Sequence, residues 1–377
     1  MATVVLGAGV VGTTTAYFLA RAGEQVTLVD RQSHVAGEGS FANTGMITPS
    51  QSSPWSSPGL LLNVVRGLGR SESQIKIRAR ALPSLTPWGL RFLRHCTERS
   101  NAENMERNHR LAAYSRDQLR ALRQDLRLDY DHTEVGTLKL YWSEESLSAA
   151  AASAARLEPL GTSFRVLDTA ACIDLEPSLK AHAGNLVGAI HCPDDETGDC
   201  AAFSRLLAER CLELGVDFRL ATTVTGIDVQ RRRVAAVQTE QGRLSADRYV
   251  IALGSFSPKH LRRFGVALPI YPVKGYSLTI PLADRQEVLG MPIIDESRAV
   301  GITPLAQGLR VGGFIDMTGP DAAVREDEID RMKRYVVELL PALAGRLDDE
   351  AVTAWACLRA LTPDGPPLIG PTPLENL

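Results

Sequence analysis

The sequence begins MATVVLGAGVVGTTTAYFLARAGEQVTLVD, and this stretch, Met1–Asp30, contains the clearest indication of the fold. An apolar run, Val4–Leu6, leads directly into three glycines spaced as Gly-x-Gly-x-x-Gly. The pattern predicts a strand, a tight turn, a helix over Val10–Ala22 and a second strand over Val26–Val29 that ends at Asp30. Together these elements form the strand–helix–strand unit that binds a dinucleotide.

Each position of this motif has its own physical task. Gly7 permits the tight turn, Gly9 lets the backbone approach a pyrophosphate, and Gly12 lets the helix pack close to the strand. The helix N-terminus supplies free N–H groups and partial positive charge for the phosphates. Asp30 can accept hydrogen bonds from both ribose hydroxyls, and the motif alone fits either NAD or FAD. The residues expected at the dinucleotide are Val5, Leu6, Gly7, Ala8, Gly9, Val10, Val11, Gly12, Asp30 and Arg31.

Length and composition set the broad class of protein. A chain of 377 residues with 44% hydrophobic residues is expected to form two domains. A net charge of −3 argues against nucleic acid as a partner. The six cysteines contain no CxxC pair, so we expect free thiols in a reducing compartment and no metal site. Without a signal peptide or an apolar run of roughly 18 residues, we expect a cytoplasmic protein, either soluble or peripheral on the inner face of the cytoplasmic membrane.

The order of predicted elements does not describe two successive domains. Strand–helix units open the chain and return near residues 202–254, whereas antiparallel-looking strands and long helices fill the remainder. We predict an α/β fold with α+β insertions, in which a Rossmann-like domain of discontinuous segments binds the nucleotide and a domain of antiparallel sheet and helices binds the substrate. The expected boundaries are 1–60, 155–258 and 345–377 for the first domain and 61–154 and 259–344 for the second.

Three further patterns give local expectations. A long helix is predicted over 101–128, with a core stripe formed by Leu111, Leu119, Leu122 and Leu126. Another strand is predicted to begin at 368–370. An acidic cluster precedes the helix expected near residue 202, and because His191 and Cys192 complete no coherent ligand set, we expect a solvated loop there. The cluster consists of Asp194, Asp195, Glu196 and Asp199.

Motifs spread along the whole chain resemble those of one family. The fingerprint is followed in order by SFANTGMITPSQSSPW, DDETGDCAAFSRLLAERCLELGV, YVIALGSFSP, YPVKGYSLTIP and LRALTPDGPPLIG. Together they resemble the FAD-dependent D-amino-acid oxidase superfamily. The SFANTG loop, the DETGDC segment and the YPVKGYSLT strand are most similar to its branch of bacterial D-amino-acid dehydrogenase small subunits.

The resemblance implies a flavoprotein with non-covalent, extended FAD. Its expected reaction is oxidative deamination of a D-alanine-like D-amino acid, by hydride transfer from Cα to flavin N5, to a 2-oxo acid and ammonia. The electrons are expected to pass to a quinone or respiratory acceptor. Oxidation of D-hydroxyproline, sarcosine or glycine is an alternative in the same superfamily, and an NAD-dependent dehydrogenase is a third, although no catalytic His or Lys constellation is recognisable.

A further alternative concerns the C-terminal end of the sequence. Relatives similar to this chain continue past the final Asn376-Leu377 with a strand, a glycine-rich turn that lies against the flavin, and a helix. An inactive, truncated flavoprotein is therefore also a hypothesis at this stage.

The resemblance also assigns candidate substrate residues. Arg359 in CLRALTPDG matches the family's carboxylate-binding arginine, although Ala360 replaces the usual proline. An arginine suits this task because its planar fork makes two parallel charged hydrogen bonds. Tyr271 and Tyr276 are candidates to cover the substrate or are half-buried strand residues. Lys274 is a candidate to stabilise the reduced flavin or a member of a structural ion pair.

A polar, glycine- and serine-rich stretch follows the second strand of the fingerprint. In the family this loop runs past the FAD phosphates and the flavin ring, which implies contacts from Ser40, Asn43, Thr44, Gly45 and Met46. Val224 resembles the position whose backbone meets the adenine. Ala252 and Gly254 resemble the close approach to the ADP portion, or are ordinary strand-end residues.

An apolar patch with flanking arginines is expected to line the substrate entrance, and contact with a membrane is the alternative. Its members are Trp55, Leu60–Leu62, Val64–Val65, Trp88, Leu90, Phe92 and Leu93, flanked by Arg66, Arg70, Arg91 and Arg94.

Overall fold

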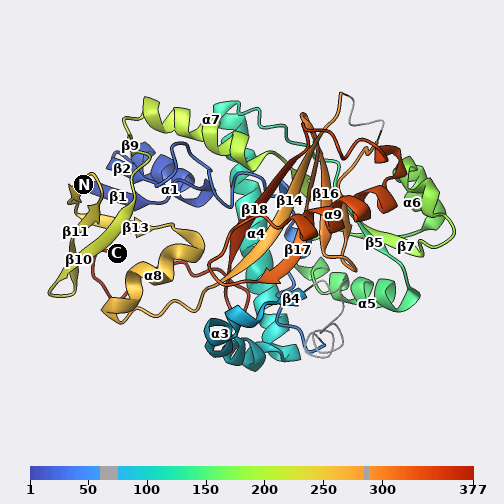
Figure 1. Cartoon of the computed structure of the whole chain (residues 1–377), viewed down its shortest axis with the longest axis horizontal. Helices are drawn as coiled ribbons and strands as arrows, with labels where there is room; N and C mark the ends of the chain where they lie inside the picture. Colours follow the sequence, from blue (N-terminus) through green and yellow to red (C-terminus); the bar gives the residue numbers. More distant parts are fainter. Residues whose placement is uncertain (60–74, 284–287) are drawn as a thin grey trace.

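The computed structural model describes residues 1–59, 75–283 and 288–377, whose elements are arranged around two larger sheets (Figure 1). A four-stranded sheet lies near both chain termini, and a nine-stranded sheet occupies the opposite part of the molecule. The long helix α4 (Glu98–Leu126) runs through the middle (Figure 1). The predicted α/β fold with α+β insertions is confirmed.

The smaller sheet contains the strand–helix–strand unit predicted from the N-terminal sequence. β1 (Ala2–Leu6), α1 (Val10–Arg21) and β2 (Gln25–Val29) follow one another as expected. The strand order is β13-β1-β2-β9, and β9 (Asp217–Arg219) and β13 (Arg248–Ile251) both run parallel to their neighbours. Parallel strands end at one common edge, which places the glycine motif beside the end of β13.

The larger sheet is mixed and brings together distant parts of the sequence. Its order is β18-β14-β17-β16-β15-β5-β7-β6, and β4 pairs with β17 beside this path. The pairs β15–β5 and β17–β4 are parallel and the other pairs are antiparallel. Its strands are β4 (Ile75–Ile77), β5 (Thr137–Tyr141), β6 (Arg165–Asp168), β7 (Gly188–Cys192), β14 (Tyr271–Pro281), β15 (Ile293–Asp295), β16 (Val300–Leu305), β17 (Gly308–Met317) and β18 (Thr353–Leu361).

Helices and two small sheets complete the structure. α9 packs on one face of the large sheet, and α7 packs against α1 beside the parallel sheet. Within the described residues, the α-helices besides α1 and α4 are α3 (Leu82–His95), α5 (Glu144–Ala155), α6 (Thr169–Leu175), α7 (Cys200–Glu213), α8 (Ser257–Leu261) and α9 (Glu326–Leu339). The small sheets pair β3 (Met46–Ile47) with β8 (Glu196–Thr197), and β10 (Val224–Gln230) with β11 (Arg233–Thr239) and β12 (Gly242–Leu244).

Sheet membership crosses the predicted domain boundaries. β6, β7 and β18 fall in segments expected to bind the nucleotide, yet they pair within the large sheet. The division of the chain into two domains at those boundaries stays a prediction.

Two local expectations are wrong. Leu111 is exposed because it lies eleven residues before the buried Leu122, or about 16 Å along the helix axis, beyond the core that Leu119 and Leu126 also contact. No strand forms at 368–370, where Ile369 is 78% exposed and no described strand pairs with the segment.

Asp195, Glu196 and Asp199 of the acidic cluster are buried rather than solvated, and Asp194 is half-buried. Asp195 accepts hydrogen bonds from the hydroxyls of Ser50 (2.5 Å) and Thr137 (2.6 Å). Asp199 caps α7 by accepting the N–H groups of residues 201 and 202. Glu196 is fully buried and pairs with arginines of α4. The expectation of a solvated loop failed because the partners of Asp195 and Glu196 come from remote segments, while Asp199 is held in the cap of α7.

Candidate active site

The backbone contacts of Gly7 and Gly12 match the roles predicted for these two glycines. Gly7 has a φ of +105°, which L side chains rarely adopt, and a Cβ there would overlap the Ala252 carbonyl. A Cβ at Gly12 would overlap the carbonyl of Gly7, so the start of α1 lies directly against the turn. Gly7 and Gly12 therefore allow the end of β1, the end of β13 and α1 to meet.

The first amides of the glycine turn and of α1 donate to nearby polar side chains. Gly9 is the N-cap residue and contributes no side-chain cap. The Ser40 hydroxyl accepts the Val10 N–H at 3.0 Å. Asp30 accepts the Ala8 N–H through Oδ2 at 2.6 Å and the Gln32 N–H through Oδ1 at 2.8 Å. Each carboxylate oxygen keeps a further lone pair, so the predicted bonds from Asp30 to the ribose stay compatible with this arrangement.

A cavity of about 340 Å³ begins at this turn and extends to β18. It brings together many residues that the sequence predicted, namely Gly7, Gly9, Val10, Val11, Asp30, Arg31, Ser40, Val224, Ala252, Gly254 and Arg359. Val5, Leu6, Ala8 and Gly12 are buried in the packed layer behind the cavity. The cavity fits the ADP portion of FAD, because it offers helix N-terminal amides, an acid at the ribose position and a close backbone approach.

Several lining residues were not predicted. Thr222 and Thr223 directly precede Val224, and Phe256 follows Gly254, so an extension of those two motifs would have found them. Lys259 and His260, in α8, carry no motif that could have indicated them. Burial, with Lys259 and Arg263 nearby, lowers the pKa of His260. The guanidinium of Arg31 lies 4.2 Å from the ring centre of Phe256 and pairs with Glu38 at 2.6 Å.

The loop after β2 connects the two sheets. Gly45 has a φ of +68°, and a Cβ there would lie 2.6 Å from the Gly198 carbonyl. A Cβ at Gly312 of β17 would lie 2.5 Å from the methyl of Thr44, and one at Gly301 of β16 would lie 3.1 Å from Met46. The loop therefore packs closely on the large sheet.

Only Ser40 of the predicted loop residues lines the nucleotide cavity. Asn43, Gly45 and Met46 instead line a neighbouring cavity of about 230 Å³ between α1, α4 and α7. The predicted contacts of residues 43–46 with the flavin stay predictions.

Arg359 lies on β18 in the wall of the nucleotide cavity, opposite Val273 of β14. Its Nη1 donates to the Phe314 carbonyl at 2.8 Å and its Nη2 to the Gly313 carbonyl at 3.4 Å. Among the described residues its hydrogen-bond partners are these carbonyls and no carboxylate, and desolvation lowers its pKa. A half-buried cation whose partners among the described residues are carbonyls is suited to an anionic ligand.

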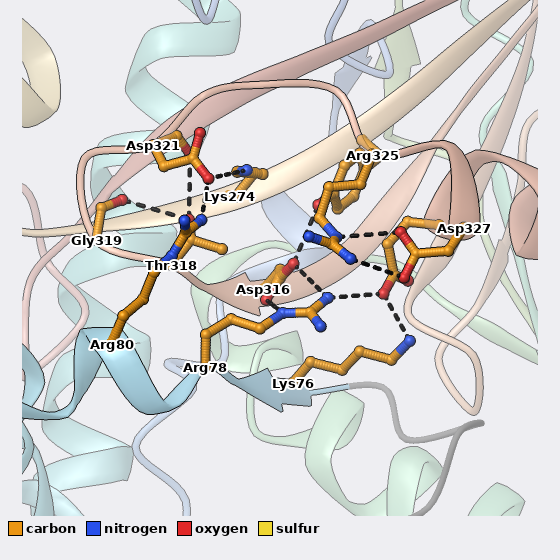
Figure 2. A network of polar contacts seen from close by, with 12 residues as sticks. Lys76, Arg78, Arg80, Lys274, Asp316, Thr318, Gly319, Asp321, Arg325 and Asp327 are labelled. Atoms are coloured by element: carbon orange, nitrogen blue, oxygen red, sulfur yellow. Dashed lines mark hydrogen bonds and ion pairs between the residues drawn. The ribbon is translucent and has the colours of Figure 1, made fainter.

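Lys274 and Tyr276 point to the opposite face of the large sheet from Arg359. Successive side chains of a strand alternate between faces, and both residues lie beside Asp316 under α9. Lys274 is fully buried and donates to Asp321 at 3.2 Å (Figure 2). It also donates to the carbonyl of Ala323 at 2.9 Å. The structure does not bring Lys274 or Tyr276 to Arg359.

Asp316 is the centre of a polar network on that opposite face. Arg78 binds both of its carboxylate oxygens at 2.9 Å (Figure 2). The Tyr276 hydroxyl donates to it at 3.0 Å. Glu328 of α9 pairs with Lys76 at 2.6 Å and with Arg78 at 3.1 Å. Burial and the neighbouring Asp316 raise the pKa of Tyr276. This network fastens β4 and α9 to β17.

Tyr271 lies on the same face of the sheet as Val273 and Arg359. It is buried, its ring lies 5.6 Å from that of Trp88, and its hydroxyl has no hydrogen-bond partner among the described residues. A buried orphan hydroxyl on the face that bears Arg359 is consistent with a contact to a ligand.

The apolar patch is only partly described. Trp88 and Phe92 stack and pack with Tyr271, and Trp55 lies against the same cluster. Leu90 and Leu93 are exposed on α3. Leu60–Leu62, Val64–Val65, Arg66 and Arg70 lie outside the described residues. Within the described ranges, no helix has the length and apolar character required to cross a membrane.

Comparisons with known proteins agree with this geometry. A family model described as FAD dependent oxidoreductase, DAO, matches residues 2–377. The chain is 42% identical over 377 residues to a D-amino acid dehydrogenase of Rhodopseudomonas palustris (strain HaA2), covering 100% of this chain and 88% of the relative. It is 41% identical to a D-amino acid dehydrogenase of Granulibacter bethesdensis, covering 100% of this chain and 90% of the relative.

Solved structures support the same fold. Glycine oxidase from Geobacillus kaustophilus superposes with a TM-score of 0.74 at 22% identity, covering 99% of this chain and 86% of that chain. L-Proline dehydrogenase from P. horikoshii gives a TM-score of 0.71 at 18% identity, covering 100% of this chain and 86% of that chain. The fingerprint, the cavity and the full-length similarity lead to one conclusion: the chain belongs to the DAO family of FAD-dependent oxidoreductases.

Proposed function

We propose that this FAD-dependent oxidoreductase deaminates D-amino acids to 2-oxo acids and ammonia and passes the electrons to a quinone or respiratory acceptor. The observation that carries the proposal is Arg359, a half-buried guanidinium without an acidic partner among the described residues, in the wall of the cavity that begins at the dinucleotide motif. Relatives 42% and 41% identical are named D-amino acid dehydrogenase, which supports the substrate class.

The chain's own residues bind and orient. The amides at the start of α1 and the carboxylate of Asp30 hold the phosphate and ribose of the nucleotide. Arg359 holds the substrate carboxylate through two parallel charged hydrogen bonds, which fixes the position of Cα. FAD, when bound, supplies the acceptor for the hydride that leaves Cα. The apolar surroundings of Tyr271 and Trp88 favour a neutral substrate amine over an ammonium ion.

An anaerobic visible spectrum of the purified protein tests the proposal. The flavin bands should bleach on addition of D-alanine and remain on addition of L-alanine. Bleaching by glycine, sarcosine or D-hydroxyproline but by no common D-amino acid would instead establish the alternative substrate class. A protein that takes up no FAD would contradict the proposal.

The electron acceptor requires a separate measurement. After reduction by D-alanine, the rate of flavin reoxidation should be much faster with a water-soluble quinone than with air-saturated buffer. Peripheral contact with a membrane, through the exposed Leu90 and Leu93 of α3, is part of the same proposal. Sedimentation with lipid vesicles that is lost in a Leu90→Ser, Leu93→Ser double variant would support this contact.

A further inference from the structure

β17 contains a bulge opposite β14. Lys274 pairs with Asp316 and Tyr276 pairs with Gly313, so β17 has one residue more than β14 over this stretch. Within the bulge, Phe314 has a φ of +60°, in the left-handed region. A bulky aromatic residue rarely adopts this conformation, because its Cβ crowds the backbone.

The unusual backbone directs two carbonyls at one guanidinium. Arg359 donates through Nη1 to the Phe314 carbonyl at 2.8 Å and through Nη2 to the Gly313 carbonyl at 3.4 Å. The guanidinium also lies over Gly275, where any Cβ would overlap its Cζ and both Nη atoms. Its plane and its rotation are therefore both fixed, and its remaining N–H groups are left for an anion.

The surroundings of Phe314 hold this strained conformation in place. Its ring is buried in the core under α9, and the guanidinium of Arg331 lies 3.7 Å from the ring centre. Its N–H donates to the Ala299 carbonyl at 3.1 Å. A Cβ at Gly313 would lie 2.6 Å from that same carbonyl, so a glycine is needed beside the bulge. Backbone strain persists only where packing of this kind fixes it, and such strain is concentrated at functional sites.

We infer that Phe314 is a positioning residue, whose left-handed backbone turns the carbonyls of residues 313 and 314 toward Arg359 and so fixes the orientation in which that arginine receives the substrate carboxylate. The inference rests on the proposed role of Arg359. According to this inference, Phe314 affects substrate affinity through its strained backbone, without contacting the substrate itself.

Two variants of Phe314 distinguish the effect of its backbone conformation from the effect of its aromatic ring. Phe314→Gly and Phe314→Val both remove the ring, but only glycine adopts a φ near +60° without steric cost. For each FAD-loaded variant, KM and kcat for D-alanine, the dissociation constant of propionate from its perturbation of the flavin spectrum, and Tm are measured. Phe314→Asn and Phe314→Ala extend the series, because asparagine tolerates the left-handed region better than alanine.

The expected result is an order of KM values that follows the cost of the left-handed backbone: glycine and asparagine lowest, then alanine, then valine. The valine variant should raise KM and weaken propionate about tenfold relative to the glycine variant, with a smaller change in kcat. Arg127→Val is the matched control, since Arg127 also has a left-handed backbone (φ +52°) but lies exposed at the end of α4. It should lower Tm without changing KM.

Two results would overturn the inference. If the glycine and valine variants raise KM equally, the ring matters and the backbone does not. If KM follows Tm across all variants, including Arg127→Val, the effect is general destabilisation. Arg359→Met distinguishes a failure of the proposed function: it should raise KM by at least the same factor, and an unchanged KM would remove the carboxylate role of Arg359 itself. Should valine prevent folding, the asparagine and alanine variants provide the same comparison.

Discussion

At the scale of single residues, the site depends on a glycine that leaves space as well as on the arginine that fills it. Gly275 has an ordinary strand conformation, so it is glycine for space and not for φ. Gly275→Ala should displace the guanidinium of Arg359 and raise KM for D-amino acids by roughly ten- to a hundredfold, the value of one charged hydrogen bond. Steady-state kinetics measure this change. Gly184→Ala, in open space, is the control and should leave KM unaltered.

Asp30 has two tasks at the nucleotide end of the cavity. It already accepts the N–H groups of Ala8 and Gln32, and it is proposed to accept the ribose hydroxyls. Asp30→Ala should therefore weaken FAD at least about tenfold, because both the turn and the ligand lose hydrogen bonds. Titration of FAD fluorescence gives the dissociation constant. Asp217→Ala, on the exposed edge strand β9, should bind FAD as the wild type does.

At the scale of elements, a buried ion pair fastens α4 to β8. Arg123 donates to Glu196 and to the hydroxyl of Tyr130, each at 3.0 Å, and Glu196 is fully buried. Arg123→Ala removes a buried cation from beside Glu196 and should lower the free energy of unfolding by about 3 kcal/mol. Urea unfolding measures this loss. Arg99→Ala, which breaks an exposed pair with Glu103 on the same helix, should change little.

The elements also show what a sequence can and cannot predict. The turn at Gly7 and the helix at α1 follow from a local spacing of glycines, and both were predicted. The burial of Glu196 was not, because its arginine partners lie in α4, far away in sequence. Gly312 and Gly313 precede the bulge, but the sequence does not indicate that the left-handed residue there is Phe314. Arg359 was found through a family motif, whereas its carbonyl partners follow only from the pairing of β17 with β14.

At the scale of the whole molecule, the cavity makes stability depend on pH. Burial and two nearby cations lower the pKa of His260 below its ordinary value of 6.5. The unfolded chain therefore binds more protons than the folded protein in this window. The free energy of unfolding of the FAD-free protein should rise as the pH increases toward 7. The contribution of His260 to it should be lost as the pH falls through the lowered pKa. The free energy of unfolding measured between pH 5 and pH 7.5 should depend less on pH in a His260→Gln variant, and an equal slope would contradict this account.

The order β13-β1-β2-β9 also has a consequence for biosynthesis. β1 lies at the centre of its sheet, yet its partner β13 follows far later in the chain, and Ala2 bonds to Asp247 across 245 residues. At 5–20 residues per second, a ribosome needs roughly 10–50 s to supply that partner. During this time β1 and the glycine turn have left the exit tunnel with β2 but without β9 and β13, so their sheet is incomplete. The nucleotide site, although first in the sequence, must be among the last parts of the nascent protein to form, and its early strands are the segments that a chaperone would have to shield.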